Sequence, residues 1–106
     1  MPYFPLLIEL MQQYVIIAYD GKDEGALDRR MAARPEHLEG VKALKAYGNY
    51  VKGGAVLDNM GKMIGSVMMV NFKTRQDLDI WLAREPYVVH NVWKEIEIRP
   101  FRVAEV

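Results

Sequence analysis

The chain has 106 residues, 51% of them hydrophobic and 26% charged, and its 14 basic and 14 acidic side chains give a formal net charge of zero. This length suits one globular domain with a modest core, and the balanced charge argues against binding to nucleic acid or to anionic membranes. The absence of cysteine excludes disulfides and thiolate chemistry, and it is typical of the reducing cytoplasm, where we expect the protein to lie.

Residues 1–12 read as an N-terminal extension to a single predicted domain that spans residues 13–106. The extension is apolar, but it lacks the basic start and small-residue cleavage site of a signal peptide. No apolar run in the chain reaches the roughly 20 residues that a transmembrane helix needs. Residues 6–10 could form a short helix against a dimer, or Met11 could mark the start of the domain, and the sequence leaves both open.

The first part of the domain predicts a strand followed by helical sequence. Residues 14–21 are a β-branched run ending in Asp-Gly, which indicates a strand and then a turn. Residues 24–33 favour a helix that breaks or kinks before Pro35, and the charged run at residues 22–34 suggests a mostly solvated face. The main predicted helix spans residues 35–47, because proline suits its first position and Gly-Asn suits its end.

The rest of the domain predicts three more strands and one more helix. A strand is expected at residues 50–57, with Gly53-Gly54 as a bulge, and another at residues 66–72 after a turn. Thr74 is the expected N-cap of a helix over residues 74–85, with Asp77 placed as in a capping box. Residues 93–101 alternate between apolar and polar and predict the last strand.

The predicted order is therefore β-α-β-β-α-β, the ferredoxin-like arrangement of the α+β class. Its antiparallel four-stranded sheet carries two helices on one face. The first and third predicted strands are apolar at nearly every position, so the second face also needs a cover. We expect a homodimer packed sheet to sheet, because an exposed apolar sheet would favour aggregation.

Helical spacing indicates where His37 points. Arg34, His37, Val41, Leu44 and Gly48 fall on one stripe of a helix, and the last three suit an inner face. His37 and Arg34 should therefore point inward, or along the rim between helix and sheet. An inward imidazole needs a polar partner, and an inward guanidinium needs an anion or carbonyl acceptors.

Glu85 is the candidate partner of His37. It continues the inner stripe of the second predicted helix, which consists of Leu78, Trp81, Leu82 and Glu85. A carboxylate beside an imidazole can fix its tautomer and prepare it for general acid/base chemistry. The same pair can equally be a structural hydrogen bond, and the sequence alone leaves both interpretations open.

Other chemistry has weaker support. A metal site built from His37, His90, Asp58 and Glu85 lacks any HxxxH-type ligand spacing, so we expect no metal and no other cofactor. Ser66 follows a glycine at a strand start but lacks the GxSxG context of serine hydrolases. His90 by itself fits a loop or interface residue. No glycine-bearing turn matches a phosphate-binding loop.

In combination, these residues resemble the YCII-related (YciI-like) family from about Tyr14 to Phe101. The segments that carry the resemblance are YVIIAYDG, RPEHLEGVKAL, GNYVKGGAVLDNMGKMIGS and EPYVVHNVWKEIEIRPF. The resemblance implies a dimeric α/β-barrel built on the ferredoxin-like fold, with a His–Asp active-site dyad and a nearby serine. His37 would take the histidine position, Ser66 the serine and Glu85 the acid, where the family usually has aspartate.

The resemblance also implies that Arg34 matches the family's arginine, which would bind an anionic substrate or hold the acid. One member of the family resembles a dehydrochlorinase of a chlorinated hydroxyquinol, whose chemistry needs proton transfer at a ring. The first hypothesis is therefore a cofactor-independent lyase or isomerase acting on a small anionic or phenolic molecule. Tyr87, Asp58 and His90 would help to bind the substrate.

Two other hypotheses stay open. The same pocket could serve a non-catalytic protein that binds a small ligand. Alternatively, Arg34, His37 and Glu85 could be a buried polar network in a purely structural dimer. For a binding protein, His37→Ala would weaken binding but no turnover would exist, and an empty or absent pocket beside His37 would favour the third hypothesis.

Overall fold

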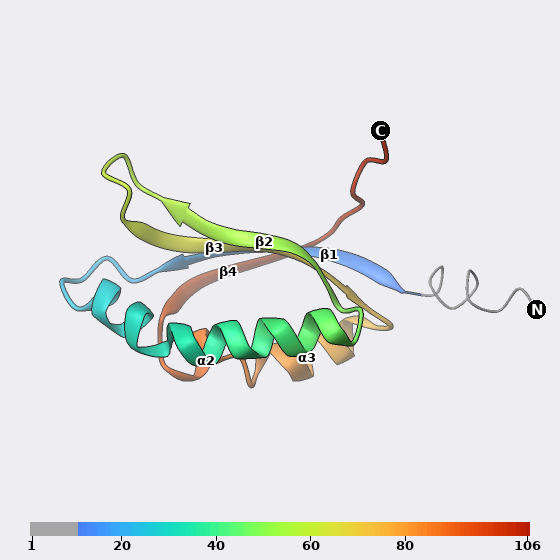
Figure 1. The fold of residues 1–106 in the computed structure, drawn as a ribbon, viewed down its shortest axis with the longest axis horizontal. Coiled ribbons are helices and arrows are strands. Elements are labelled where there is room, and N and C mark those ends of the chain that lie inside the picture. Colours follow the sequence, from blue (N-terminus) through green and yellow to red (C-terminus); the bar gives the residue numbers. More distant parts are fainter. Residues whose placement is uncertain (1–10) are drawn as a thin grey trace, which may run out of the picture.

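A computed structural model describes residues 11–106 of the protein, in which one antiparallel sheet carries all the helices on one face (Figure 1). The strand order is β2-β3-β1-β4. The elements are β1 (Gln12–Asp20), α2 (Ala26–Ala46), β2 (Tyr50–Leu57), β3 (Met63–Phe72), α3 (Arg75–Leu82), α4 (Pro86–Val89) and β4 (Trp93–Pro100). The predicted ferredoxin-like fold is confirmed. The short helix suggested for residues 6–10 lies outside the described residues.

The core lies between the sheet and the helices. Alternate residues of β1 and β3 point toward the helices, and Ile16, Ala18 and Val70 are almost completely buried there. Leu78 of α3 and Val92 before β4 complete the same cluster. Each aliphatic side chain buried in this way stabilises the fold by about 1.5–3 kcal/mol.

Helix α2 continues through Pro35, so of the predicted alternatives, a break or a kink before this residue, the break is wrong. Proline removes one helical hydrogen bond and crowds the carbonyl four residues earlier, which usually bends a helix. The first turns of α2 are indeed inclined to the later ones in Figure 1. Because Pro35 is exposed while Ala33 and His37 on either side of it are buried, packing against the sheet holds both halves in one helix.

Two local features of the sheet and connections differ from the prediction. Gly53 and Gly54 pair regularly with Met68 and Val67, so the bulge predicted there is wrong. The register of β2 shifts instead after Tyr50 and before Leu57. Near-regular pairing at the glycines is possible because Gly53 has no Cβ, which would lie 2.8 Å from the Val67 carbonyl oxygen.

The second predicted helix divides into α3 and α4. Thr74 caps α3 as expected, because its side-chain oxygen accepts a hydrogen bond from the Asp77 N–H. Helix α3 ends at Leu82, and Glu85 has an extended backbone that starts the short helix α4 at Pro86. Glu85 is therefore the N-cap of α4 rather than the last residue of a longer helix.

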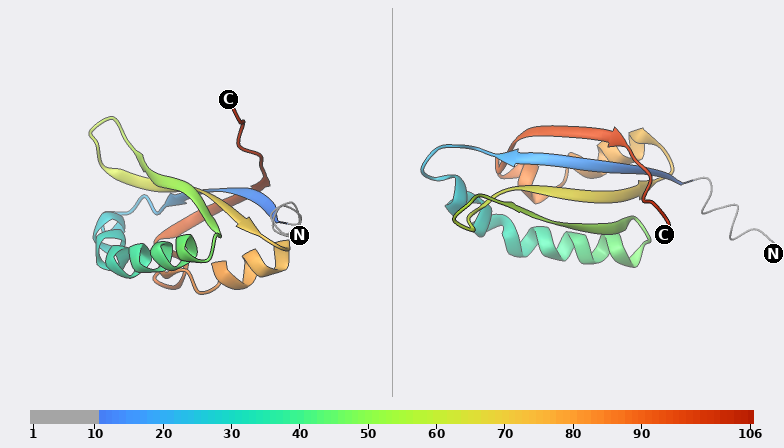
Figure 2. Two further views of the ribbon diagram at one scale, coloured as in Figure 1. Left: turned by 45° about the vertical axis from the view of Figure 1, so that its right-hand side comes forward. Right: turned by 90° about the horizontal axis from the view of Figure 1, so that it is seen from above.

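The second face of the sheet carries no helix within the described chain (Figure 2). Val15, Ile17 and Tyr19 of β1 alternate with the core residues and lie on this open face. Val67 and Met69 of β3 lie beside them, since β1 and β3 pair residue by residue. The open face is therefore largely apolar along its two central strands.

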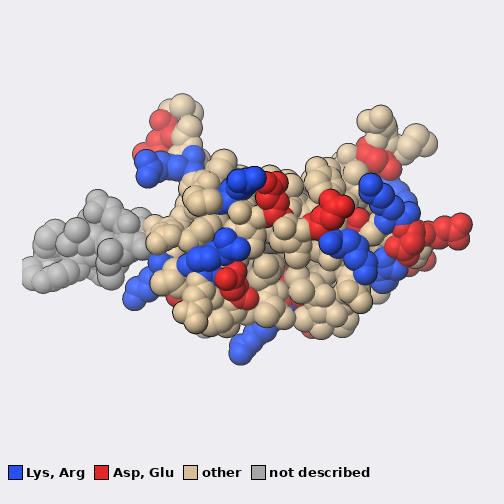
Figure 3. All heavy atoms as spheres, turned by 180° about the vertical axis from the view of Figure 1, so that it is seen from behind, with Lys and Arg blue, Asp and Glu red and all other residues tan. Residues whose placement is uncertain are grey.

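Acidic and basic side chains alternate over the side of the molecule seen in Figure 3, without a large region of one sign. This distribution matches the formal net charge of zero. Within residues 11–106, no helix combines the length and the apolar character that crossing a membrane requires.

Candidate active site

A pocket of about 100 Å³ lies between α2 and the sheet. Helix α2 forms one wall, strands β2 and β3 form the opposite wall, and Tyr87 of α4 also lines the pocket. The lining residues are Arg30, Arg34, His37, Leu38, Val41, Tyr50, Gly53, Gly54, Ala55, Ser66, Met68 and Tyr87. The pocket thus combines two guanidinium groups and one imidazole with apolar and aromatic walls, as small-molecule sites commonly do.

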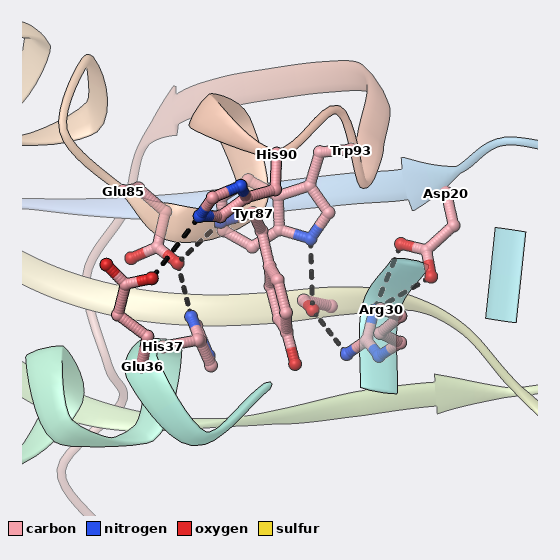
Figure 4. A network of polar contacts seen from close by, with 9 residues as sticks. Asp20, Arg30, Glu36, His37, Glu85, Tyr87, His90 and Trp93 are labelled. Carbon is pink, nitrogen blue, oxygen red and sulfur yellow. Dashed lines mark hydrogen bonds and ion pairs between the residues drawn. The ribbon is translucent and has the colours of Figure 1, made fainter. Parts of the chain in front are cut away.

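His37 and Glu85 are in direct contact in this pocket (Figure 4). The His37 Nδ1 atom faces Glu85 Oε1, and both side chains are buried. The same carboxylate oxygen accepts a hydrogen bond of 3.2 Å from the Tyr87 N–H, because Glu85 is the N-cap of α4. A carboxylate at Nδ1 selects the tautomer with the proton on that nitrogen, which leaves Nε2 as the acceptor of neutral His37.

Two aromatic rings fix the plane of the imidazole. His37 stacks on Tyr87 with ring centroids 4.0 Å apart, and the edge-on Trp93 ring is 6.1 Å away. His37 Nε2 has no hydrogen-bond partner among residues 11–106, although His37 lines the pocket. The arrangement therefore leaves one nitrogen available to a molecule that enters the pocket.

Arg30 connects two further polar side chains beneath the pocket. Its Nη1 donates to both carboxylate oxygens of Asp20, at 3.0 and 3.1 Å, and its Nη2 donates to Ser66 Oγ at 2.8 Å. Its guanidinium lies 4.7 Å from the centre of the Tyr87 ring, on the side away from His37 in Figure 4. Tyr87 is thus held between the imidazole and the guanidinium.

Trp93 joins this network because β4 has an irregular start. Tyr19 pairs with Glu95, but Asp20 pairs with Trp93, so Lys94 is skipped. The shift turns Trp93 toward the helices, where its Nε1–H donates to Ser66 Oγ at 3.2 Å. Three elements of the fold therefore meet at the Ser66 hydroxyl.

Burial changes the acidity of two groups at the site. It raises the pKa of the Asp20 carboxyl, and the hydrogen bonds and charge of Arg30 oppose this without cancelling it. Burial also raises the pKa of the Tyr87 phenol above its ordinary value of 10.0, against the nearby positive charges of Arg30 and Arg34. Tyr87 is accordingly a neutral phenol at neutral pH.

The structure brings together five of the seven residues singled out in the sequence. His37, Ser66, Arg34 and Tyr87 line the pocket, and Glu85 contacts His37 from behind. Arg34 is half-buried and forms no ion pair with any residue in the described part of the chain. Its charge is therefore available to a ligand.

Asp58 and His90 lie outside the pocket. Asp58 belongs to the turn between β2 and β3, where its Oδ1 accepts hydrogen bonds from the Met60 and Lys62 N–H groups. His90 ends α4 and is exposed, with its Nε2 3.3 Å from Glu36 Oε2. Within residues 11–106, no three His, Asp or Glu side chains are grouped as metal ligands would be.

Sequence reasoning missed Arg30, Asp20 and Trp93. Arg30 precedes Arg34 by four residues and His37 by seven, so it lies on the same helical stripe. The expected break at Pro35 hid this relation, and the prediction of a solvated face is wrong for Arg30, which is only 3% exposed. Asp20 was counted with the turn after β1, and no simple signal predicts the irregular register that turns Trp93 inward.

Comparison with known proteins places the chain among small ferredoxin-like proteins. The family described as YCII-related domain matches residues 12–102. Protein YciI of Escherichia coli O6:H1 is 30% identical over 95 residues, which cover 84% of this chain and 95% of that protein.

Two solved structures are similar in fold. The 5-chloro-2-hydroxyhydroquinone dehydrochlorinase of Burkholderia phenoliruptrix AC1100, in complex with 2,5-dihydroxybenzoquinone, has a TM-score of 0.75 at 18% identity and covers 87% of this chain and 95% of its own. A dimeric ferredoxin-like protein of unknown function from Jannaschia sp. CCS1 has a TM-score of 0.50 at 16% identity, covering 88% and 99%.

Proposed function

The chain belongs to the YCII-related domain family, and on that basis we propose that it is a cofactor-independent enzyme of the lyase or isomerase type. His37 transfers a proton to or from a small anionic or phenolic molecule in the pocket. The observation that carries this proposal is the contact of His37 Nδ1 with the buried Glu85 carboxylate, which leaves Nε2 for the substrate.

The surrounding charges suit this chemistry. When His37 Nε2 removes a proton, the imidazolium that forms lies against the Glu85 carboxylate, which stabilises the positive charge. The negative charge that develops on the substrate is met by the Arg34 guanidinium, which lines the same pocket. Returning the proton from Nε2 at a different substrate atom, or expelling a leaving group, completes an isomerisation or an elimination.

The size and walls of the pocket limit the substrate. A volume of about 100 Å³ admits a single ring or a short chain, and Tyr87, Met68 and Val41 offer flat or apolar surfaces to it. The dehydrochlorinase with a similar fold is in complex with a one-ring quinone, which supports a substrate of this kind. Asp58 and His90 are left out of the proposed site because they do not line the pocket.

Proton transfer can be tested by following hydrogen–deuterium exchange at the ring positions of 2,5-dihydroxybenzoquinone in heavy water by NMR. We expect the chain to accelerate exchange over the spontaneous rate, and His37→Gln to remove roughly a hundredfold or more of that acceleration. His90→Gln is the matched control, because it changes the only other histidine and lies outside the pocket.

The outcomes separate the alternatives. Equal acceleration by the parent chain and His37→Gln would overturn the role of His37. Saturable binding without accelerated exchange would instead favour a protein that binds a small ligand and does no chemistry. Neither binding nor exchange would favour a structural role for the polar network.

We propose in addition that a second copy of the chain covers the open face of the sheet. The apolar side chains of Val15, Ile17, Val67 and Met69 on that face support this arrangement, since contiguous apolar surface of this kind usually marks an interface. The dimeric state of the ferredoxin-like protein from Jannaschia sp. CCS1 points the same way.

A further inference from the structure

The Ser66 hydroxyl accepts two hydrogen bonds from groups that can only donate. Arg30 Nη2 lies 2.8 Å from Ser66 Oγ, and Trp93 Nε1 lies 3.2 Å from the same atom. A guanidinium and an indole N–H have no acceptor function at neutral pH, so the direction of both hydrogen bonds is fixed. A serine hydroxyl has two acceptor positions and one donor, and both acceptor positions are therefore occupied.

The remaining O–H of Ser66 has no acceptor within residues 11–106, although Ser66 is only 3% exposed and lines the pocket. A buried hydroxyl that cannot donate its hydrogen bond loses free energy, unless a ligand accepts it. We propose that Ser66 is a fixed hydrogen-bond donor for a negatively charged oxygen of the ligand, with Trp93 and Arg30 as its positioning residues. This inference rests on the site of the proposed function and names the ligand oxygen that the site recognises.

The same geometry makes Ser66 unsuitable as a nucleophile. A serine nucleophile needs a base that accepts its proton, and no such base lies within hydrogen-bond distance of Ser66 Oγ in the described chain. Two N–H donors also withdraw electron density from the oxygen. They polarise the O–H bond and strengthen it as a donor, which is the property that an oxyanion-binding group needs.

The neighbouring charges favour an anionic oxygen over a neutral one. Arg30 donates to Ser66 through Nη2, and Asp20 holds the other nitrogen of the guanidinium and so fixes its orientation. Arg34, which forms no ion pair within residues 11–106, adds a cation on the same wall of α2. The ligand class is therefore a ring or short conjugated molecule that carries a phenolate or enolate oxygen, bound with its oxygen at Ser66 and its proton-bearing atom toward His37.

The test compares two coloured or ultraviolet-absorbing probes of similar size, 4-nitrophenolate and nitrobenzene, of which only the first carries the oxyanion. The ratio of their dissociation constants is measured for the parent chain, Ser66→Ala, Trp93→Phe and Trp81→Phe. Trp81→Phe is the matched control, since the only other tryptophan packs on Phe72, away from the pocket. Trp93→Phe keeps an aromatic ring at this position and removes the N–H donor together with part of the indole, a loss of ring that the control Trp81→Phe shares.

We expect the parent chain to prefer 4-nitrophenolate. Ser66→Ala should reduce that preference roughly tenfold or more, the range for one hydrogen bond to a charged group, and Trp93→Phe about threefold by freeing the hydroxyl to rotate. Trp81→Phe should leave the ratio unchanged. Addition of 4-nitrophenolate should also shift the NMR signal of the Trp93 indole N–H, which a purely structural tryptophan would not show.

An unchanged ratio in both Ser66→Ala and Trp93→Phe would overturn the donor assignment. The assignment would also be wrong if the parent chain bound nitrobenzene as tightly as 4-nitrophenolate, or did not bind 4-nitrophenolate. Ser66→Ala leaves two buried N–H groups unpaired and can unfold, in which case Trp93→Phe decides the result. The experiment measures binding alone. Its outcome is therefore separate from the exchange assay with His37→Gln, and either can fail without the other.

Discussion

The imidazole of His37 stacks on the phenol ring of Tyr87, with ring centroids 4.0 Å apart and 14° between the planes. Tyr87 lies two residues after Glu85, whose carboxylate contacts His37 Nδ1. One short segment, the start of α4, thus supplies both the surface on which the imidazole rests and the group that orients it. Replacing Tyr87 should therefore change the packing of the imidazole, whereas replacing Glu85 should change its orientation.

Removal of the Glu85 carboxylate should change the tautomer of His37. In the parent chain we expect neutral His37 to carry its proton on Nδ1, because the carboxylate accepts a hydrogen bond there. Glu85→Ala should produce a mixture of tautomers, visible in the nitrogen chemical shifts of the ring. His90 serves as the internal control, and a parent spectrum already showing a tautomer mixture at His37 would contradict the orienting role of Glu85.

Substitution of Arg30 should destabilise the fold strongly. Arg30→Met leaves the Asp20 carboxylate buried without its partner, and we expect a loss of about 3–5 kcal/mol in the free energy of unfolding near neutral pH. The neighbouring Arg29→Met removes an exposed pair with Asp23 and should cost far less. Urea denaturation followed by circular dichroism measures both, and equal losses would contradict the buried network.

The deficit of Arg30→Met should depend on pH in a defined direction. Burial raises the pKa of Asp20, so its contribution to stability is complete below its ordinary value of 3.8 and is lost as the pH rises through the folded pKa. In the parent chain Arg30 lowers the pKa of Asp20. The Arg30→Met substitution therefore raises this pKa further and enlarges the loss of stability at higher pH. The deficit should therefore be largest near neutral pH and shrink toward acid pH, and Asp20→Asn in the same chain should abolish this pH dependence.

Pro35→Ala should stabilise the protein and weaken its site. Alanine restores a helical hydrogen bond and removes the crowding in α2, for a gain of about 1–3 kcal/mol. A straighter helix would move Arg30 relative to His37, since Pro35 lies between them. The midpoint temperature of thermal unfolding should therefore rise while the affinity for 4-nitrophenolate falls. A rise in both quantities would show that the bend in α2 has no part in the site.

Two tyrosines should resist ionisation in alkali. Burial raises the pKa of Tyr50 and Tyr87 above the ordinary 10.0. Their contribution to stability is complete below that value and is lost as the pH rises through their folded pKa, so the chain should lose stability in strong alkali. Ultraviolet titration of tyrosinate should show late-titrating groups, and Tyr87→Phe and Tyr50→Phe should each remove one of them.

A charge on the open sheet face should separate the proposed dimer. Ile17 lies at the centre of that face, opposite Val67 and Glu97 on the flanking strands. Ile17→Glu would bury a carboxylate in the interface and should give a monomer in light scattering, whereas Ile80→Glu changes an exposed residue of α3 and should not. A parent chain that is already monomeric would contradict the dimer.

The fold was predictable because periodicity is a local property. The β-branched run of β1, the alternation in β4 and the Thr74 cap each act within a few residues, and they are sufficient for the order of the elements. The inward direction of His37 follows from the same helical spacing. The need for glycine at position 65, just before Ser66, cannot be predicted from local spacing. It arises from tertiary packing, because a Cβ at Gly65 would lie 2.4 Å from the Ala18 carbonyl oxygen.

The missed residues depend on long-range packing. Arg30 stays in the helix because the sheet holds both sides of the proline, which overrides the local preference for a break. Glu85 begins a new short helix rather than ending a longer one, and Trp93 turns inward through a register shift against β1. The register shift at Trp93 in particular has no signal in the local sequence.

The hydrogen bonds at Ser66 join residue 30, residue 66 and residue 93, so they span most of the chain. The strand that supplies Trp93 is the last element of the described chain, and it pairs with the first described strand. Contacts this far apart in sequence form late and slowly in folding. A chain that lacks β4 therefore lacks the Trp93 donor that holds Ser66, and the return of 4-nitrophenolate binding after denaturation would follow the pairing of β4 with β1 rather than the formation of the helices.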